Sequence, residues 1–443
     1  MKWLLAPLLA VLAAAAFAAG DRPLALVGGT LVDGYGNPPL RNSVIIVEGE
    51  RIAAVGTLGQ LAIPADAEVI STEGMTVLPG LWDLRAHLAR LGHADEGRWT
   101  EHYLPIAERV VMPMAAAQLL AAGVTSARDA GAPLTASLRV RERLRERRIP
   151  GPTLFVPGPL LAKDRRPGAD TWRWTVAGAE DARAKVRRLA DAGVDYVLLD
   201  DLGLWTDAEL TAAIGEAHTR GLPVEAVAGR EAAIARAVEA GVDGLQGVGL
   251  DAAGYPEDLY RIIERRARDG GRRPLAWSPA LSGVFNFQDL QRNPEPLDDP
   301  ATMAGLPPIV VADLLGPISR FEGSGWYDMP AVRAPTLCTK LRQLDEAGVR
   351  LAVGSDSGAP AHLHSRATWQ EIDAWVRECG MDPKRAIQAA THDAAAAMRI
   401  EHLSGTISPG KVADIIAVRG DLLRHPALLQ RVDLVIHRGL RHR

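Results

Sequence analysis

Two kinds of hydrophobic pattern divide the chain into a long central region and two ends. Between residues 24 and 78, short apolar runs alternate with Gly, Asn and Asp breakers, as in LALVGGTLVDG, NSVIIVEGERIAAVG and AEVISTEGMTVLPG. Such runs are typical of β-strands joined by turns. The pattern returns near the end of the chain in GTISPGKVADIIAVRGDLL and VDLVIHRG. Because chain termini often lie close together, we expect residues 20–78 and 405–443 to form one small composite β-sandwich domain.

The central region, residues 79–404, alternates apolar strand-like runs with helical stretches rich in Ala, Leu and Arg. The strand candidates are VLPGLWDL, GVTSARDAG, TLFVPGPLL, DYVLLD, PVEAVAG, GLQGVG, PLAWSPA and VRLAVGSD, with helices such as 180–192, 207–220 and 230–240 between them. An Ala-Gly-Val triplet recurs four times where a Gly would end a helix before the next strand. Eight such units predict an α/β fold, a (β/α)₈ TIM-type barrel. The Pro- and Gly-rich stretch 281–331 predicts a long loop after the seventh strand, of the kind that often forms a lid.

The first residues have the pattern of a secretory signal peptide. Lys2 precedes an apolar core from Leu4 to Ala16, and small residues follow where signal peptidase cleaves. We therefore expect a signal peptide over residues 1–19, a periplasmic or secreted protein, and no membrane contact after cleavage. Cys338 and Cys379 could pair in such a compartment, but their spacing alone does not show that the geometry permits it.

Composition narrows the class of protein without choosing a function. Hydrophobic residues make up 47% of the chain and charged residues 23%, which excludes a disordered, collagen-like or coiled-coil protein. The net charge of −4 gives no indication of a nucleic-acid partner. The partner that we expect is a small-molecule ligand or substrate. Eleven histidines are enough for a metal site, whereas two cysteines are too few for a zinc–thiolate cluster.

Five motifs carry a resemblance to a known family. They are TVLPGLWD at 76–83, AGVTSARD at 122–129, GSDSGAP at 354–360, AAT at 389–391 and GTISPGKVAD at 405–414. In these motifs the chain resembles the amidohydrolase superfamily, specifically its imidazolonepropionase-like and prolidase-like metal-dependent hydrolases. The resemblance implies hydrolysis of non-peptide or dipeptide C–N bonds. It also implies one or two divalent metals, such as zinc, at the C-terminal mouth of the barrel.

The resemblance implies six metal-ligand positions, and this chain retains two of them. His87 is the second residue of the expected His-x-His pair after strand one, and Asp356 is the expected Asp after strand eight, which would also move the proton in catalysis. The other positions hold residues that do not ligate metals, namely Arg85, Leu198, Val227 and Gly247. A guanidinium has no free lone pair, and no Lys or His occurs in 195–204 or 223–250. The sequence therefore predicts a degenerate metal site with no metal bound in the family manner.

Two interpretations of the barrel mouth remain open at this point. Either the metal chemistry is lost, or a site for one divalent metal is rebuilt from other residues, for which the weaker candidates are Asp200, Asp201, His362 and His364. If no metal is present, the buried Asp356 needs another positive partner. Arg85 lies on the strand next to strand eight in a closed barrel, so we expect an Arg85–Asp356 ion pair.

Tryptophans are concentrated in the segments expected to surround the mouth. Trp172, Trp174, Trp205, Trp277 and Trp326 would form an aromatic pocket for a planar or sugar-like ligand, with Trp99 nearby. The alternative is that these rings pack the loops against the barrel. Two functions follow from these patterns: a hydrolase of C–N bonds whose activity is in question, or a non-catalytic, exported binding protein that uses the mouth as its pocket.

Overall fold

The structure is a computed structural model that describes residues 22–443 except 94, 167, 252, 270–273, 287–302, 304, 307, 309, 313 and 315–328. The expected signal peptide, most of the expected lid and Trp326 lie outside the described residues.

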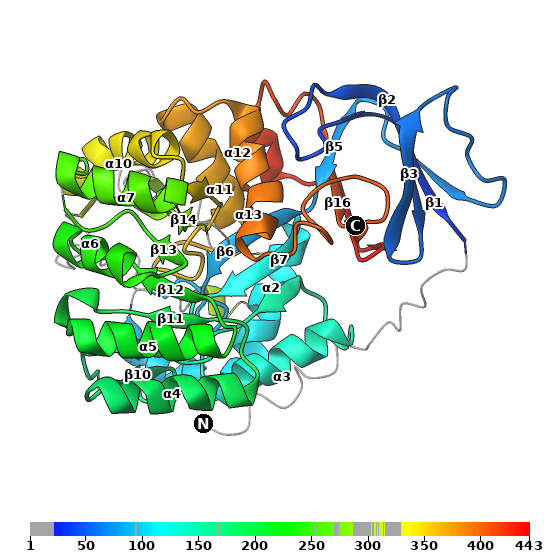
Figure 1. Ribbon diagram of the computed structural model, residues 1–443. Helices are drawn as coiled ribbons and strands as arrows, with labels where there is room; N and C mark the ends of the chain where they lie inside the picture. The colour runs from blue at the N-terminus through cyan, green and yellow to red at the C-terminus, as the bar shows by residue number, and fades with distance from the viewer. Residues whose placement is uncertain are drawn as a thin grey trace.

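Both ends of the chain form one eight-stranded sheet, on the right in Figure 1. Its strands are β1 (Leu24–Leu31), β2 (Leu40–Glu48), β3 (Arg51–Thr57), β4 (Glu68–Ser71), β5 (Met75–Pro79), β16 (Ile415–Arg419), β17 (Leu434–His437) and β18 (Leu440–Arg441). The order is β18-β17-β16-β5-β1-β2-β3, with β4 beside β1. The two ends join where β5 and β16 run antiparallel, with Val77 opposite Ala417. Alternate residues such as Leu26, Ile45 and Ile415 are buried in one cluster, so the predicted composite domain is confirmed.

Parallel strands build the barrel, which lies to the left of this sheet in Figure 1. They are β6 (Leu81–Ala86), β7 (Val124–Asp129), β8 (Thr153–Phe155), β9 (Leu160–Ala162), β11 (Val197–Leu199), β12 (Val224–Val227), β13 (Gly244–Gln246), β14 (Ala276–Ser278) and β15 (Arg350–Leu351), with β10 (Arg173–Thr175) beside β9. The chain after β15 closes the barrel against β6, because the Leu84 amide donates to the Val353 carbonyl at 2.9 Å and the Asp356 amide to the Arg85 carbonyl at 2.8 Å. The predicted barrel is confirmed.

The third barrel strand differs from the expectation of one continuous run. TLFVPGPLL forms two short strands, β8 and β9, separated by Val156-Pro-Gly-Pro159. Proline has no amide hydrogen for a sheet ladder, and Gly158 adopts the left-handed region with φ +68°. The break lets β9 reach the mouth beside β10.

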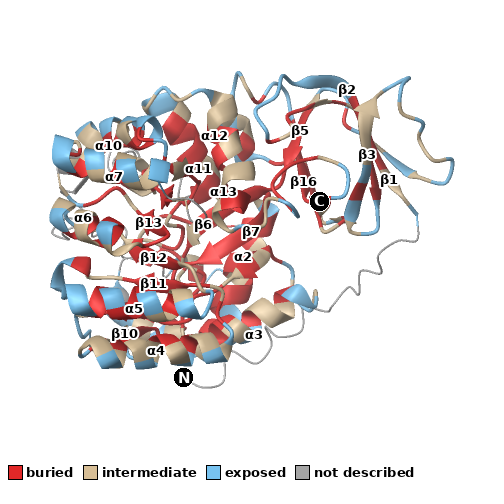
Figure 2. Ribbon diagram, viewed as in Figure 1, coloured by how far each residue is buried: buried red, intermediate tan, exposed pale blue. Residues whose placement is uncertain are grey.

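Helices surround the strands, with their exposed faces outward and the buried strands inside (Figure 2). They are α2 (Met112–Ala121), α3 (Leu134–Arg145), α4 (Ala179–Ala192), α5 (Asp207–Thr219), α6 (Glu231–Ala240), α7 (Glu257–Asp269), α10 (Met329–Glu346), α11 (Ala367–Asp373), α12 (Pro383–Ala389) and α13 (His392–Ala397). Helices α4, α5 and α6 match the predicted ranges within one residue at each end. Gly193 and Gly241 end α4 and α6 in the left-handed region, as the recurring triplet predicts.

Among the described residues, one helical stretch, Trp99–Ala121, is long and apolar enough to cross a membrane by length and composition. Half of its most apolar window is buried inside the protein. A helix in a protein core can have the same length and apolar composition.

Cys338 and Cys379 form a disulfide. It ties α10 to the end of the helical turn Ala374–Glu378 that continues α11. The pairing that the sequence left open is therefore made in the structure.

Candidate functional site

The centre of the barrel mouth is a carboxylate shared by two basic side chains. Arg85, near the end of β6, places its Nε 2.8 Å from Asp356 Oδ1. His87 places its Nε2 2.9 Å from the same oxygen. The Arg85 contact is a close charge pair without hydrogen-bond alignment at Nε. The expected Arg85–Asp356 ion pair is thus confirmed, and His87 joins it.

The surroundings keep this carboxylate ionised. Burial alone would raise the pKa of Asp356, but the Arg85 charge and the hydrogen bond with His87 outweigh it, so this pKa lies well below its usual range. Burial lowers the pKa of His87; the neighbouring Asp356 opposes that shift, while the Arg90 and Arg85 charges add to it. At neutral pH the group is therefore a charged Arg–Asp pair beside a neutral imidazole.

The Arg85 guanidinium extends toward the end of β13, the sixth strand of the barrel. A Cβ built on Gly247 would lie 2.9 Å from Arg85 Nη1, and Gly247 itself has φ +81°. A side chain at position 247 would compete with the guanidinium for the same space. The Arg85 side chain, from β6, therefore fills the space that a side chain at position 247 would need.

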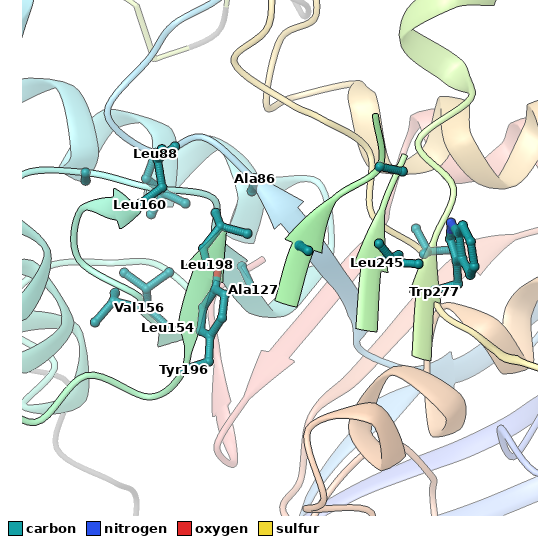
Figure 3. Packing of buried hydrophobic residues seen from close by; sticks show 14 of the residues in the cluster. Ala86, Leu88, Ala127, Leu154, Val156, Leu160, Tyr196, Leu198, Leu245 and Trp277 are labelled. Atoms are coloured by element: carbon teal, nitrogen blue, oxygen red, sulfur yellow. The ribbon is translucent and has the colours of Figure 1, made fainter. Parts of the chain in front are cut away.

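The substituted ligand positions on β11 and β12, the fourth and fifth strands of the barrel, hold apolar residues in the structure. Leu198 on β11 is fully buried and lies in the hydrophobic cluster shown in Figure 3, together with Leu160 and Tyr196. Val227, at the end of β12, lines the pocket at the mouth.

Asp200 and Asp201 follow β11, and both hold Arg173. Arg173 Nη1 donates to Asp200 Oδ2 at 2.7 Å, and its Nη2 donates to Asp201. Asp201 also accepts the backbone amide of Asp164 at 2.8 Å. Since the Arg173 side chain is almost fully buried, these carboxylates act in the structure as the counter-charge of an arginine.

His362 and His364 are buried behind the mouth and are not among the described residues that line its pocket. His362 Nε2 lies 3.3 Å from Ser282 Oγ. Burial lowers the pKa of His362 to about 4 and that of His364 to about 3. Both rings pack a loop in neutral form, which is the plainer of the two roles that the sequence allowed.

A pocket of about 150 Å³ opens on this group. Its described lining consists of Arg85, His87, Arg90, Ala130, Leu160, Arg166, Trp172, Arg173, Asp200, Val227, Gln246, Asp356, Ala359 and Pro360. Arg90, Arg166, Arg173 and Gln246 were not predicted from the sequence. One signal was present: residues 164–175, which include Trp172, carry three arginines.

The expectation of a tryptophan-lined pocket is largely wrong. Trp172 is the tryptophan among the described lining residues. Trp174 lies under Arg188 in a separate pocket. The buried Trp205 and Trp277 donate their indole N–H groups to the backbone oxygens of Asp200 and Gly247, both at 2.7 Å. These two rings pack the barrel, because a buried indole needs an acceptor and the strand ends supply one.

A second charge pair lies deeper in the barrel. Arg128 on β7 contacts both carboxylate oxygens of Glu225 on β12, at 2.8 and 3.0 Å, and both side chains are buried. Beside Arg128, burial raises the pKa of Asp129 to about 7 although three backbone amides lower it. This second charge pair was not predicted from the sequence.

Comparison with known proteins now places the chain. The model of the family described as "Amidohydrolase family" matches residues 76–264 and 332–440. The chain belongs to the amidohydrolase family. An uncharacterised protein of Mycobacterium tuberculosis is 27% identical over 378 residues, which is 83% of this chain and 85% of that protein. Adenine deaminase 4 of Rhizobium meliloti is 36% identical over 86 residues, 18% of this chain and 14% of that protein.

Solved structures agree with this membership at the level of the fold. A putative prolidase from Bifidobacterium longum has a TM-score of 0.74 and 24% identity, and the match covers 95% of this chain and 94% of that one. At this identity the likeness shows the fold alone.

The mouth of this amidohydrolase-family barrel does not fit the divalent metal that the family implies. Zinc in an enzyme needs three or four N, O or S ligands that converge on one point. Among the described residues, no group of three or more His, Cys, Asp and Glu side chains is close enough to hold a metal ion. His87 and Asp356 supply two, and they bond to each other. A guanidinium stands beside them where further ligands would be needed.

Proposed function

We propose that this chain is a member of the amidohydrolase family that binds a small molecule at the barrel mouth without metal-dependent hydrolysis. The observation that carries the proposal is the position of the Arg85 guanidinium, which lies between Asp356 and the end of β13. A fixed positive charge within 2.8 Å of the Asp356 carboxylate repels a metal cation from the same place.

Hydrolysis of an amide at neutral pH needs an activated water. Metal-bound water is acidified by the ion, and the donors for that ion are absent among the described mouth residues. Asp356 is a poor general base, because Arg85 and the hydrogen bond with His87 hold the pKa of its carboxyl well below the usual range. The Arg85, His87 and Asp356 side chains therefore form a fixed ion pair and do not activate a water molecule.

The competing function is hydrolysis of a non-peptide or dipeptide C–N bond. The observations that favour it are family membership, the retained His87 and Asp356, and relatives named as a putative prolidase and an adenine deaminase. This function requires a metal to displace Arg85 from Asp356.

A paired assay separates the two functions. Wild-type protein and His87→Ala, both purified after growth with added zinc, are incubated with Xaa-Pro dipeptides, lactams, ureas and adenine. We expect equal, background rates for both proteins. Turnover by the wild type that His87→Ala abolishes would overturn the proposal.

We also propose that the protein is exported to the periplasm or beyond. The predicted signal peptide supports this location, and so does the Cys338–Cys379 disulfide, because such bonds persist in oxidising compartments. Cell fractionation with mass spectrometry of the N-terminus tests it: a chain shortened by about 19 residues outside the cytoplasm is expected, and a full-length cytoplasmic chain would contradict it.

A further inference from the structure

A second pocket, which we call the α4 pocket, lies between the segment around β10 and helix α4, at the lower left of Figure 1. Its volume of about 410 Å³ falls within the range of small-molecule sites, which is about 300–1,000 Å³. The described lining holds four basic side chains, Arg165, Arg173, Lys185 and Arg188, against one acidic side chain, Asp170. The α4 pocket is therefore a basic hollow that the proposed function does not use.

Two of the basic side chains already have counter-charges outside the lining. Arg173 donates to Asp200 and Asp201. Lys185 Nζ donates to Asp181 Oδ1 at 2.6 Å. Because these carboxylates balance them, Arg173 and Lys185 bring little net charge to the α4 pocket.

Arg165 and Arg188 have no carboxylate partner among the residues that the structure describes. Within that part of the chain, neither guanidinium forms an ion pair or a hydrogen bond, and both residues are exposed. Asp170 is also exposed and forms no ion pair with a described residue. The uncompensated charges of the described lining are therefore two positive and one negative, which gives the α4 pocket a positive potential.

Arg188 is held in a fixed orientation. Its guanidinium carbon lies over the Trp174 ring, 4.5 Å from the ring centre. Helix α4 positions Arg188, and the pairing of β10 with β9, where Trp174 lies opposite Leu161, positions the ring. A guanidinium stacked on a ring keeps its N–H groups in its own plane, where the ring does not cover them. Arg188 therefore presents a preorganised fork of donors that suits the oxygens of an anion.

The anion that fits the α4 pocket best is a phosphate group. A phosphate monoester carries about 1.5 to 2 negative charges at neutral pH and three acceptor oxygens, so it can use both uncompensated guanidinium groups. A carboxylate has two oxygens and a single charge, and it would leave one of the arginines without a partner. Arg165 precedes β10 and Arg188 belongs to α4, so the two forks come from different elements around one hollow.

Asp170 and Thr175 limit the rest of the ligand. A phosphate alone would leave the Asp170 carboxylate as a repulsive neighbour. An ionised carboxylate accepts hydrogen bonds, so a hydroxyl group on the ligand would turn that neighbour into a partner. Thr175 adds a hydroxyl that can donate or accept, and Ala177 and Trp174 supply the apolar part of the described lining. The lining therefore favours a hydroxylated body over an apolar one.

We propose that the α4 pocket binds a phosphate monoester of a small polyhydroxylated molecule, such as a sugar phosphate. Arg165 and Arg188 bind the phosphate group, and Asp170 accepts a hydrogen bond from a hydroxyl group of the ligand. The site is separate from the barrel mouth, so this inference goes beyond the proposed function.

Isothermal titration calorimetry of the purified protein tests the ligand class. The probes are glucose 6-phosphate, glucose, gluconate and inorganic phosphate. Glucose 6-phosphate should bind at least about tenfold more tightly than glucose or gluconate, because the two arginines form their strongest hydrogen bonds with a doubly charged group. It should also bind at least about threefold more tightly than inorganic phosphate, which has no sugar hydroxyl for Asp170.

Two matched pairs of arginines locate the binding. Arg188 lines the α4 pocket, whereas its neighbour Arg187 lies 3.4 Å from Glu216 on α5. Arg165 lines the α4 pocket, whereas its neighbour Arg166 lines the barrel mouth. Arg188→Gln and Arg165→Gln should each weaken the binding of glucose 6-phosphate about tenfold. Arg187→Gln and Arg166→Gln remove the same charge and should weaken it by less than about threefold.

Four results would overturn the inference. They are no binding of glucose 6-phosphate, glucose or gluconate bound as tightly as glucose 6-phosphate, inorganic phosphate bound as tightly, and equal weakening by a pocket variant and its control. The urea midpoints of all four variants should stay close to that of the wild type, because substitutions at such surface positions change stability little. None of these results bears on hydrolysis at the barrel mouth, so the proposed function would survive them.

Discussion

Replacing Arg85 with Met removes the positive partner of Asp356 and keeps a side chain of similar length. The Arg85 and Asp356 side chains are only 15% and 21% exposed, so the carboxylate would be left largely desolvated. Breaking a buried pair by removing one partner costs about 3–5 kcal/mol. His87 still contacts Asp356, which places the expected loss near about 3 kcal/mol.

A double-mutant cycle isolates the pair from other effects of the substitution. Asp356→Asn removes the negative charge, and the double variant removes both charges. Unit charges about 4 Å apart at an effective dielectric constant of about 20 interact by about 4 kcal/mol. Because the site is partly wet, we expect a coupling of about 2–3 kcal/mol, with the double variant more stable than Arg85→Met alone.

Urea unfolding followed by tryptophan fluorescence and circular dichroism measures the cycle. Arg139→Met is the control, since Arg139 is largely exposed and lies 3.4 Å from Glu108; it should change stability by less than about 0.5 kcal/mol. A coupling within about 0.5 kcal/mol of zero for Arg85 and Asp356 would refute the claim that the arginine replaces the metal as the partner of the carboxylate.

Three further predictions concern the frame around the site. The pKa of the buried Asp129 is raised to about 7, so the folded protein retains a proton that the unfolded chain releases above about pH 4. Wild-type stability should therefore fall as pH rises from about 4 to 7, and Asp129→Asn should remove up to about 4 kcal/mol of that loss; urea midpoints at pH 5 and 8 check this, and an unchanged pH dependence would contradict it. Replacing Cys338 and Cys379 with Ser opens a loop of 41 residues and should cost about 4 kcal/mol on the chain-entropy estimate, whereas an unchanged urea midpoint would count against the bond. Arg128→Met should lose about 3–5 kcal/mol and recover most of it when combined with Glu225→Leu; a double variant as unstable as the single one would show that the pair is not the source of the loss.

The fold was predictable because its signals are local. Each strand–helix unit carries its own apolar run, and each helix end carries its own Gly, so α4, α5 and α6 lie where the pattern predicts. The split of the third strand follows from Pro157 and Pro159, whose missing amide hydrogens are visible in the sequence.

Only part of the site could be predicted in the same way. Barrel topology makes strands one and eight neighbours, which is enough to bring Arg85 to Asp356. Topology does not fix side-chain rotamers, so the contact of His87 with the same oxygen and the reach of Arg85 over Gly247 were not predictable.

The tryptophans and the additional arginines show where sequence reasoning stops. Whether an indole lines a pocket depends on whether a backbone oxygen nearby accepts its N–H, as happens for Trp205 and Trp277. Arg90 stacks against both Trp99 and Trp172. These two tryptophans lie far apart in the sequence, so only the folded structure shows that they meet.

Metal analysis of the purified protein tests the central claim most directly. After growth with added zinc, without chelators during purification, inductively coupled plasma mass spectrometry should find far less than one zinc, manganese or iron ion per chain, because Arg85 occupies the mouth and two ligands remain. One equivalent of metal per chain that His87→Ala removes would contradict the account.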